Sequence, residues 1–97
     1  MIPEVAMLKV VMGQESEFES AFGKAQRIIS TMPGYIEHEL QRCIEVTGKY
    51  VFLVRWNSLE DHEIGFRLSP QYQEWKRLLH HFYDPFPVVE HFELVYC

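Results

Sequence analysis

The segment Tyr50–Trp56, YVFLVRW, places the strongest constraint on the fold, because it is apolar at both alternate sets of positions until Arg55. A strand with one face in water alternates apolar and polar residues, whereas a strand covered on both faces is a nearly continuous apolar run. We therefore predict that this segment is a central strand of the sheet and is covered on both sides.

The flanking segments show two different periods. Phe18, Phe22 and Ala25 belong to a series spaced by three and four residues, which is typical of one face of an amphipathic helix. After the helix-stopping Met32–Gly34, residues alternate so that Ile36, His38, Leu40 and Arg42 share one strand face and Tyr35 lies on the other. The predicted strands are Glu4–Val11, Tyr35–Ile44, Tyr50–Trp56 and Val88–Tyr96, and the predicted helices are Glu15–Thr31, Ser58–Leu68 and Pro70–Phe82.

Two helix starts follow the central strand. Ser58 precedes Asp61 by three residues, an approximate capping box, and Ser69 is followed by Pro70, which suits the first helical position. The resulting order, β-α-β-β-α-α-β in one domain of 97 residues, predicts an α+β, ferredoxin-like fold with a four-stranded antiparallel sheet and helices on one face. The uncovered apolar face of such a sheet predicts a homodimer.

Composition excludes several classes of function. A net charge of -5 without a Lys/Arg cluster argues against a nucleic-acid partner, and the absence of a long apolar run argues against a membrane span. Two cysteines are too few for a disulfide framework and favour a cytoplasmic protein. His80 and His81 are neighbours on a helix and point about 100° apart, so we expect no metal site. No glycine-rich phosphate loop or dinucleotide fingerprint predicts a cofactor.

Three segments together resemble the antibiotic biosynthesis monooxygenase (ABM) domain family: MPGYIEHELQRC, YVFLVRWNSLEDHE and SPQYQEWKRLL. The resemblance runs in order from about Val5 to Val95. It implies a dimeric α+β barrel, in which each subunit holds a cavity between its sheet and its helices. The family includes cofactor-free oxygenases of aromatic polyketides, haem-degrading monooxygenases and quinol oxygenases.

The haem-degrading branch of the family has an Asn on the first strand, a Trp in the first short helix and a His ligand in the second. Those positions fall near Ala6, near Gly65 or Phe66, and near Trp75 or Lys76 in this chain. All three residue types are missing, so the resemblance implies no haem. We expect no cofactor.

The candidate site residues lie mainly between the central strand and the last helix. His62, one helical turn from Leu59 and Phe66, is a candidate general base, and His38 joins it if its strand face looks toward the helices. The expected substrate-binding wall consists of Trp56, Phe66, Tyr72 and Trp75. For His62 and the aromatic residues the alternative interpretation is a packed core residue, and for His62 also a rim residue among acids. The alternative for His38 is a place in the dimer interface.

These observations lead to one expected function and several alternatives. The expectation is a cofactor-independent monooxygenase that binds a small aromatic, quinol-like or polyketide-like compound in the cavity. The alternatives are a non-catalytic or stress-related dimer that binds a small apolar ligand, an isomerase that uses the same pocket, and an interaction module with no ligand. A resemblance of fold does not choose between oxygenase and isomerase.

Overall fold

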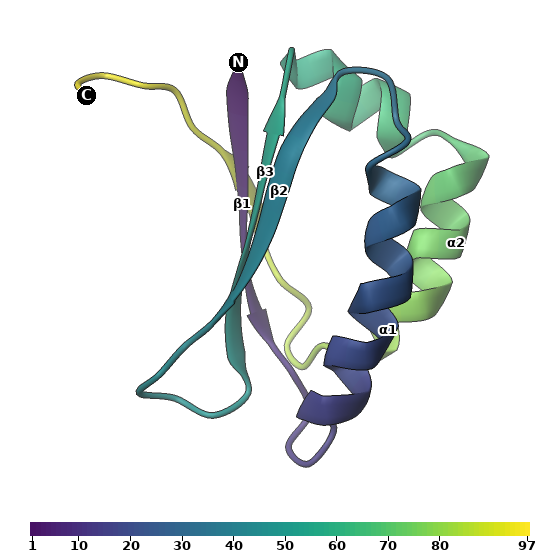
Figure 1. The fold of residues 1–97 in the computed structure, drawn as a ribbon, viewed down its shortest axis with the longest axis vertical. Helices are drawn as coiled ribbons and strands as arrows, with labels where there is room; N and C mark the ends of the chain where they lie inside the picture. Colours follow the sequence, from purple (N-terminus) through teal and green to yellow (C-terminus); the bar gives the residue numbers. More distant parts are fainter.

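The computed structural model describes residues 1–97 as an open antiparallel sheet with helices on one face (Figure 1). Its strands are β1 (Ile2–Lys9), β2 (Tyr35–Arg42), β3 (Lys49–Trp56) and β4 (Val89–His91), arranged in the order β2-β3-β1-β4. All three pairings are antiparallel, and the apolar β3 lies inside the sheet. The predicted ferredoxin-like fold class is confirmed.

Helices α1 (Glu15–Ile29) and α2 (Pro70–Leu79) contact each other and cover the same face of the sheet (Figure 1). At the start of α2 the Ser69 hydroxyl accepts the backbone N–H of Tyr72 at 3.1 Å, which confirms the predicted N-cap. The Ser58 hydroxyl accepts the backbone N–H of Asp61 and donates to its carboxylate. None of the helices is long and apolar enough to cross a membrane.

The segment between β3 and α2 differs from the predicted helix Ser58–Leu68. It forms a short π-helix, η1 (Asp61–Phe66), in which the backbone N–H of Arg67 bonds to the carbonyl of His62 at 3.0 Å. A π-helical turn is wider than an α-helical one and is common at functional sites. A short 3-10 turn, η2 (His80–Phe82), takes the place of the last residues predicted for α2.

The last strand is shorter than predicted, because β1 begins at Ile2 and so offers β4 few partners beyond the pair Glu4–His91. The backbone N–H of Phe92 still bonds to the carbonyl of Pro3 at 2.9 Å. Beyond it the chain leaves the sheet on the side away from the helices (Figure 1). The side chains of Leu94, Val95 and Tyr96 are exposed there.

A β-bulge in β2 makes the faces of that strand differ from the predicted ones. Pairing with β3 shifts register between Tyr35 and Glu37, so Tyr35 packs against the core together with Leu40, while Ile36 is 43% exposed. The alternation rule had placed Ile36 on the same face as His38 and Leu40, and Tyr35 on the opposite face. One extra residue in a strand reverses the side to which every earlier residue points, which is why the rule failed here.

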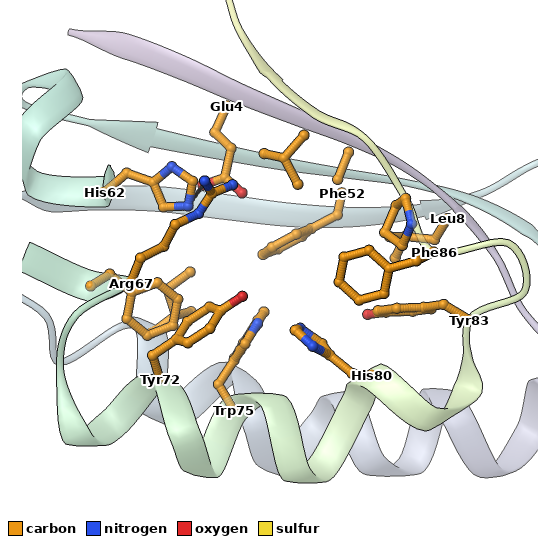
Figure 2. Close-up of a pocket in the computed structure, with 15 residues that line it drawn as sticks. Glu4, Leu8, Phe52, His62, Arg67, Tyr72, Trp75, His80, Tyr83 and Phe86 are labelled. Carbon is orange, nitrogen blue, oxygen red and sulfur yellow. Dashed lines mark ion pairs between the residues drawn. The ribbon is translucent and has the colours of Figure 1, made fainter. Parts of the chain in front are cut away.

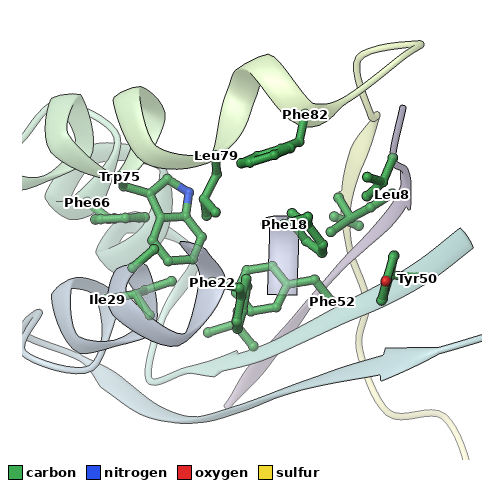
Figure 3. Packing of buried hydrophobic residues seen from close by; sticks show 14 of the residues in the cluster. Leu8, Phe18, Phe22, Ile29, Tyr50, Phe52, Phe66, Trp75, Leu79 and Phe82 are labelled. Atoms are coloured by element: carbon green, nitrogen blue, oxygen red, sulfur yellow. The ribbon is translucent and has the colours of Figure 1, made fainter. Parts of the chain in front are cut away.

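The core lies between the sheet and the two helices and consists largely of aromatic side chains (Figure 3). Phe22 of α1 contacts Phe52 of β3 and Trp75 of α2 with ring centroids 5.2 Å and 5.9 Å apart. Edge contacts of this kind add to the stabilisation that comes from burying apolar surface. The core thereby ties both helices to the central strand.

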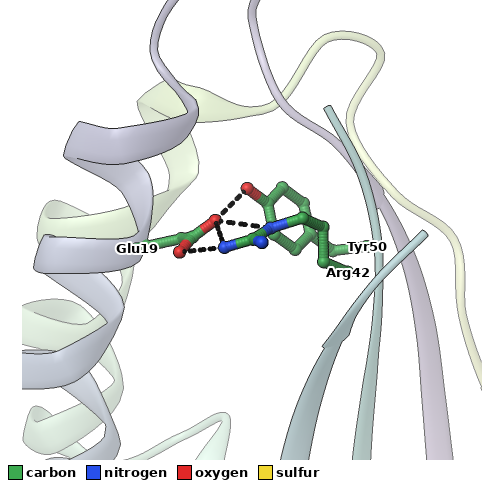
Figure 4. Close-up of polar contacts among 3 residues, drawn as sticks. All are labelled: Glu19, Arg42 and Tyr50. Carbon is green, nitrogen blue, oxygen red and sulfur yellow. Dashed lines mark hydrogen bonds and ion pairs between the residues drawn. The ribbon is translucent and has the colours of Figure 1, made fainter. Parts of the chain in front are cut away.

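A cluster of three polar side chains links the first half of α1 to the sheet (Figure 4). The Glu19 carboxylate accepts hydrogen bonds from the Arg42 guanidinium at 2.7 Å and from the Tyr50 hydroxyl at 2.7 Å. The bond from Arg42 lowers the pKa of Glu19, whereas burial and then the Glu19 carboxylate raise the pKa of Tyr50 to about 12. All three groups are thus engaged within the protein.

Candidate functional site

A cavity of about 320 Å³ lies between the sheet, η1 and α2 (Figure 2). Its volume is at the lower end of the range for small-molecule sites. Ten of its fifteen lining residues are hydrophobic. The lining consists of Glu4, Ala6, Leu8, Ile29, Phe52, His62, Phe66, Arg67, Tyr72, Trp75, His80, Tyr83, Phe86, Pro87 and Val89.

Four of the six predicted site residues meet at this cavity: His62, Phe66, Tyr72 and Trp75. The predicted order of elements brings them together, because η1 and α2 follow each other over the same part of the sheet. Trp56 is not part of the lining. It is completely buried behind the wall, with its ring stacked on the His62 imidazole at a centroid distance of 5.5 Å.

His38 lies outside the cavity, although its side chain points toward the helices. Its Nε2 atom is 2.9 Å from the amide oxygen of Gln26 on α1, and its Nδ1 atom contacts the Tyr35 hydroxyl. Partial burial lowers the pKa of His38. With both ring nitrogens engaged, His38 is part of the packing between β2 and α1.

The cavity wall holds a buried carboxyl group, that of Glu4 on β1. Glu4 is 4% exposed, and its Oε1 atom accepts a hydrogen bond from the Trp56 indole Nε1 at 2.8 Å. His62, which is 3% exposed, places its Nε2 atom 3.3 Å from the same oxygen. The carboxyl group and the imidazole therefore form a buried pair on one wall of the cavity, with Trp56 behind it.

Burial disfavours charge on both members of this pair. It raises the pKa of Glu4 from 4.5 to about 7, against smaller lowering effects of the Trp56 hydrogen bond and the Arg67 charge. Burial, followed by the positive charges of Arg67 and His91, lowers the pKa of His62 from 6.5 to about 3. His62 is therefore uncharged near neutral pH, and its 3.3 Å contact with Glu4 is not an ion pair there.

Several hydrogen-bond donors on the cavity wall have no partner within the protein. The Arg67 guanidinium, the Tyr72 hydroxyl and the Trp75 indole N–H make no hydrogen bond or ion pair with other residues. In Figure 2 Tyr72 and Trp75 point their polar atoms into the cavity. An apolar cavity with unengaged donors suits a ligand that is mostly hydrocarbon and carries oxygen atoms.

The sequence interpretation missed four polar residues at or beside this cavity: Glu4, Arg67, His80 and His91. A signal for Glu4 was present, because the inner face of β1 reads Glu4, Ala6, Leu8 and a carboxylate in such a series is out of place. His80 had been weighed only as a metal ligand. Burial lowers its pKa to about 4, and no group of three or more His, Cys, Asp or Glu side chains is placed to hold a metal ion.

Comparison with known proteins shows which family the chain matches. Residues 1–78 match the model of the family described as antibiotic biosynthesis monooxygenase. An uncharacterised protein of Bacillus subtilis strain 168, YczJ, is 59% identical over 93 residues, which cover 96% of this chain and 98% of that protein.

Solved structures are similar over almost the whole chain. A Bordetella bronchiseptica protein assigned to the antibiotic biosynthesis monooxygenases superposes with a TM-score of 0.92 at 30% identity, covering 98% of this chain and 97% of that one. SnoaB of Streptomyces nogalater, a cofactor-independent oxygenase, gives a TM-score of 0.86 at 20% identity, covering 99% and 94%. At that level of identity the likeness to SnoaB concerns the fold.

Proposed function

The chain belongs to the antibiotic biosynthesis monooxygenase family, and from that premise we propose that it is a cofactor-independent monooxygenase. The proposed substrate is a small planar aromatic compound, quinol-like or polyketide-like, with an acidic hydrogen. The observation that carries the proposal is the buried Glu4–His62 pair on the wall of an otherwise apolar cavity. SnoaB, which has the same fold, is a cofactor-independent oxygenase.

The proposed reaction begins with the removal of a proton from the bound compound. Glu4 is the stronger candidate base, since a carboxylate with a pKa of about 7 is poised near neutral pH, whereas His62 has a pKa of about 3. His62 then holds the Glu4 carboxyl group in place. The role assigned to His62 from the sequence, that of the base itself, passes to its partner in this proposal.

The substrate supplies the electrons for the later steps. Its carbanion gives one electron to O₂, and the resulting radical and superoxide combine to a peroxide. The peroxide takes up one proton and loses water to leave a carbonyl group. The protein contributes a mostly apolar cavity and fixed placement, with Phe66 and Trp75 as aromatic walls and Tyr72 and Arg67 as donors to the oxygen atoms.

The proposed enzyme is a homodimer formed through the uncovered sheet face. Apolar side chains on that face, away from the helices, are Val5, Met7, Val51 and Leu53. The exposed apolar residues that follow β4 extend on the same side of the molecule (Figure 1). Covering this surface with a second copy removes it from water, which favours association. A cytoplasmic location, suggested by the free cysteines Cys43 and Cys97, stays a prediction.

The test is oxygen uptake by chelator-treated protein with a panel of quinols and anthrones. We expect at least one compound to be oxidised with consumption of O₂, and Glu4→Gln to lower the rate by about 10²-fold or more. Glu17→Gln, which changes an exposed glutamate on α1, is the matched control and keeps the wild-type rate. Conversion of a compound without O₂ consumption identifies an isomerase, and binding without conversion identifies a ligand-binding protein.

A further inference from the structure

The contact between Glu4 and His62 continues away from the cavity. Nδ1 of His62 lies 2.7 Å from Nε2 of His91 on β4, and Nδ1 of His91 lies 3.9 Å from Oε1 of Glu63. Exposure rises along this series. Glu4 and His62 are buried, the His91 side chain is 17% exposed and the Glu63 side chain is 47% exposed. Four proton-carrying groups thus follow one another from the cavity wall to the surface, and the last step, at 3.9 Å, is longer than a hydrogen bond.

We propose that Glu4, His62, His91 and Glu63 form a proton relay between the cavity and solvent, in which His62 passes protons by exchanging its tautomer. The relay itself is a property of the folded protein, and its use in oxygenation rests on the proposed function. Nothing in the family resemblance assigns a role to His91 or Glu63.

These contacts allow two arrangements that differ by one proton at each end. In the first, Nε2–H of His62 faces the Glu4 carboxylate at 3.3 Å, and Nδ1 of His62 accepts a hydrogen bond from Nε2–H of a charged His91. In the second, Glu4 carries the proton and faces an unprotonated Nε2 of His62, whose Nδ1–H donates to a neutral His91. Passing between them breaks two N–H bonds and forms one O–H and one N–H bond.

His62 stays neutral in both arrangements, which matches its surroundings. Its ring lies against Trp56 and Phe66, and the nearby charged or titratable groups are Glu4 on β1, Arg67 beyond η1 and His91 on β4. Burial and these positive charges disfavour an imidazolium at His62. A proton therefore crosses His62 only if one ring nitrogen gains a proton as the other loses one.

The groups around Glu4 keep both of its protonation states accessible. Trp56 on β3 and Arg67 favour the carboxylate, whereas burial favours the acid. Tyr72 on α2, whose pKa is raised mainly by burial, stays a neutral phenol. Oxygenation takes a proton from the substrate and later returns one to the peroxide, so Glu4 changes its protonation state during the proposed reaction.

The deciding experiment needs no substrate. Protein labelled with ¹⁵N in histidine and ¹³C in the glutamate carboxyl is titrated by NMR from about pH 5 to 8. At the midpoint of the Glu4 titration we expect the ¹⁵N chemical shifts of Nδ1 and Nε2 of His62 to change places, so that the nitrogen that was protonated becomes unprotonated and the other becomes protonated. Glu4→Gln abolishes this exchange, and His81→Gln, at an exposed histidine, leaves it unchanged.

A second measurement on the same samples tests His91. His91→Ala slows proton exchange at Glu4, seen as line broadening, by about a hundredfold, and added imidazole restores it. A doubly protonated His62 within this pH range, or unchanged exchange in His91→Ala, overturns the relay. Failure of the wild type to consume O₂ with any quinol or anthrone contradicts the proposed function, whereas the NMR result alone decides the relay.

Discussion

The indole nitrogen of Trp56 donates a hydrogen bond of 2.8 Å to the carboxyl group of Glu4, 52 residues earlier in the chain. The two residues lie on the adjacent strands β3 and β1, where Glu4 is paired with Val54. Trp56 had been predicted as part of the cavity wall, yet it acts from behind that wall. Its N–H is the group that keeps the buried Glu4 carboxyl group hydrogen-bonded in either protonation state.

The first prediction concerns the pH dependence of stability in Glu4→Gln. The folded-state pKa of Glu4 is raised, so its contribution to the free energy of unfolding is fully present below pH 4.5 and is lost as pH rises through about 7. The shift corresponds to about 3 kcal/mol. The stability of wild type relative to Glu4→Gln should therefore fall by about that amount between about pH 4 and 8, measured by urea unfolding at a fixed protein concentration.

The titration of His62 changes the free energy of unfolding with pH in the opposite direction. This contribution cancels when wild type is compared with Glu4→Gln, because both proteins retain His62. Its pKa is lowered to about 3, so its contribution is present above pH 6.5 and is lost as pH falls through about 3. A difference between wild type and Glu4→Gln that does not vary with pH would show that Glu4 is not buried as the structure has it.

The second prediction concerns Trp56→Phe. Losing the indole donor leaves the Glu4 carboxylate without its hydrogen bond, so the pKa of Glu4 should rise above about 7. The free energy of unfolding should fall by about 1–3 kcal/mol. Trp75→Phe is the matched control, since its indole N–H has no partner in the protein and only packing is lost. The ¹³C titration of Glu4 should move in the first variant and stay in place in the second.

The third prediction compares two glycines. Gly34, between α1 and β2, has φ +83°, and a Cβ there would overlap the side chain of Asp61. Gly34→Ala should therefore lower stability by about 2 kcal/mol or more. Gly23, inside α1, has open space around it, and Gly23→Ala should raise stability by about 0.5–1 kcal/mol. Thermal unfolding of the two variants gives shifts of opposite sign, and equal shifts would contradict the structure.

The fourth prediction concerns assembly. Leu53 lies on the uncovered face of β3, paired with Val5 on one side and Glu39 on the other. Leu53→Asp should convert the proposed homodimer to a monomer in size-exclusion chromatography with light scattering, because a carboxylate loses its hydration in a sheet interface. Gln73→Asp, at an exposed position on α2, adds the same charge and should leave the dimer intact. A wild-type monomer at micromolar concentration would contradict the proposed interface.

Local sequence signals were sufficient for the elements and for part of the site. Ser69 with Pro70 marks the start of α2, and the hydroxyl of Ser58 makes the N-cap bond expected of it. The apolar spacing put Phe66 on the face of its helix that meets the sheet. Such signals work because backbone hydrogen bonding and side-chain period are decided within a few residues.

The polar centre of the cavity depended on tertiary structure. Alternation places Glu4 on the inner face of β1, but it does not say which side chain lies opposite. Only the packing of β1, β3, η1 and β4 brings Glu4 to Trp56 and His62, and His62 to His91, which is 29 residues further along the chain. The low dielectric of that packed interior raises the pKa of Glu4 and lowers that of His62. Local patterns in the sequence therefore determined the elements and their apolar faces. The chemistry of the cavity was decided by contacts between segments far apart in the chain, because desolvation and hydrogen bonding at a buried group depend on everything that surrounds it in space.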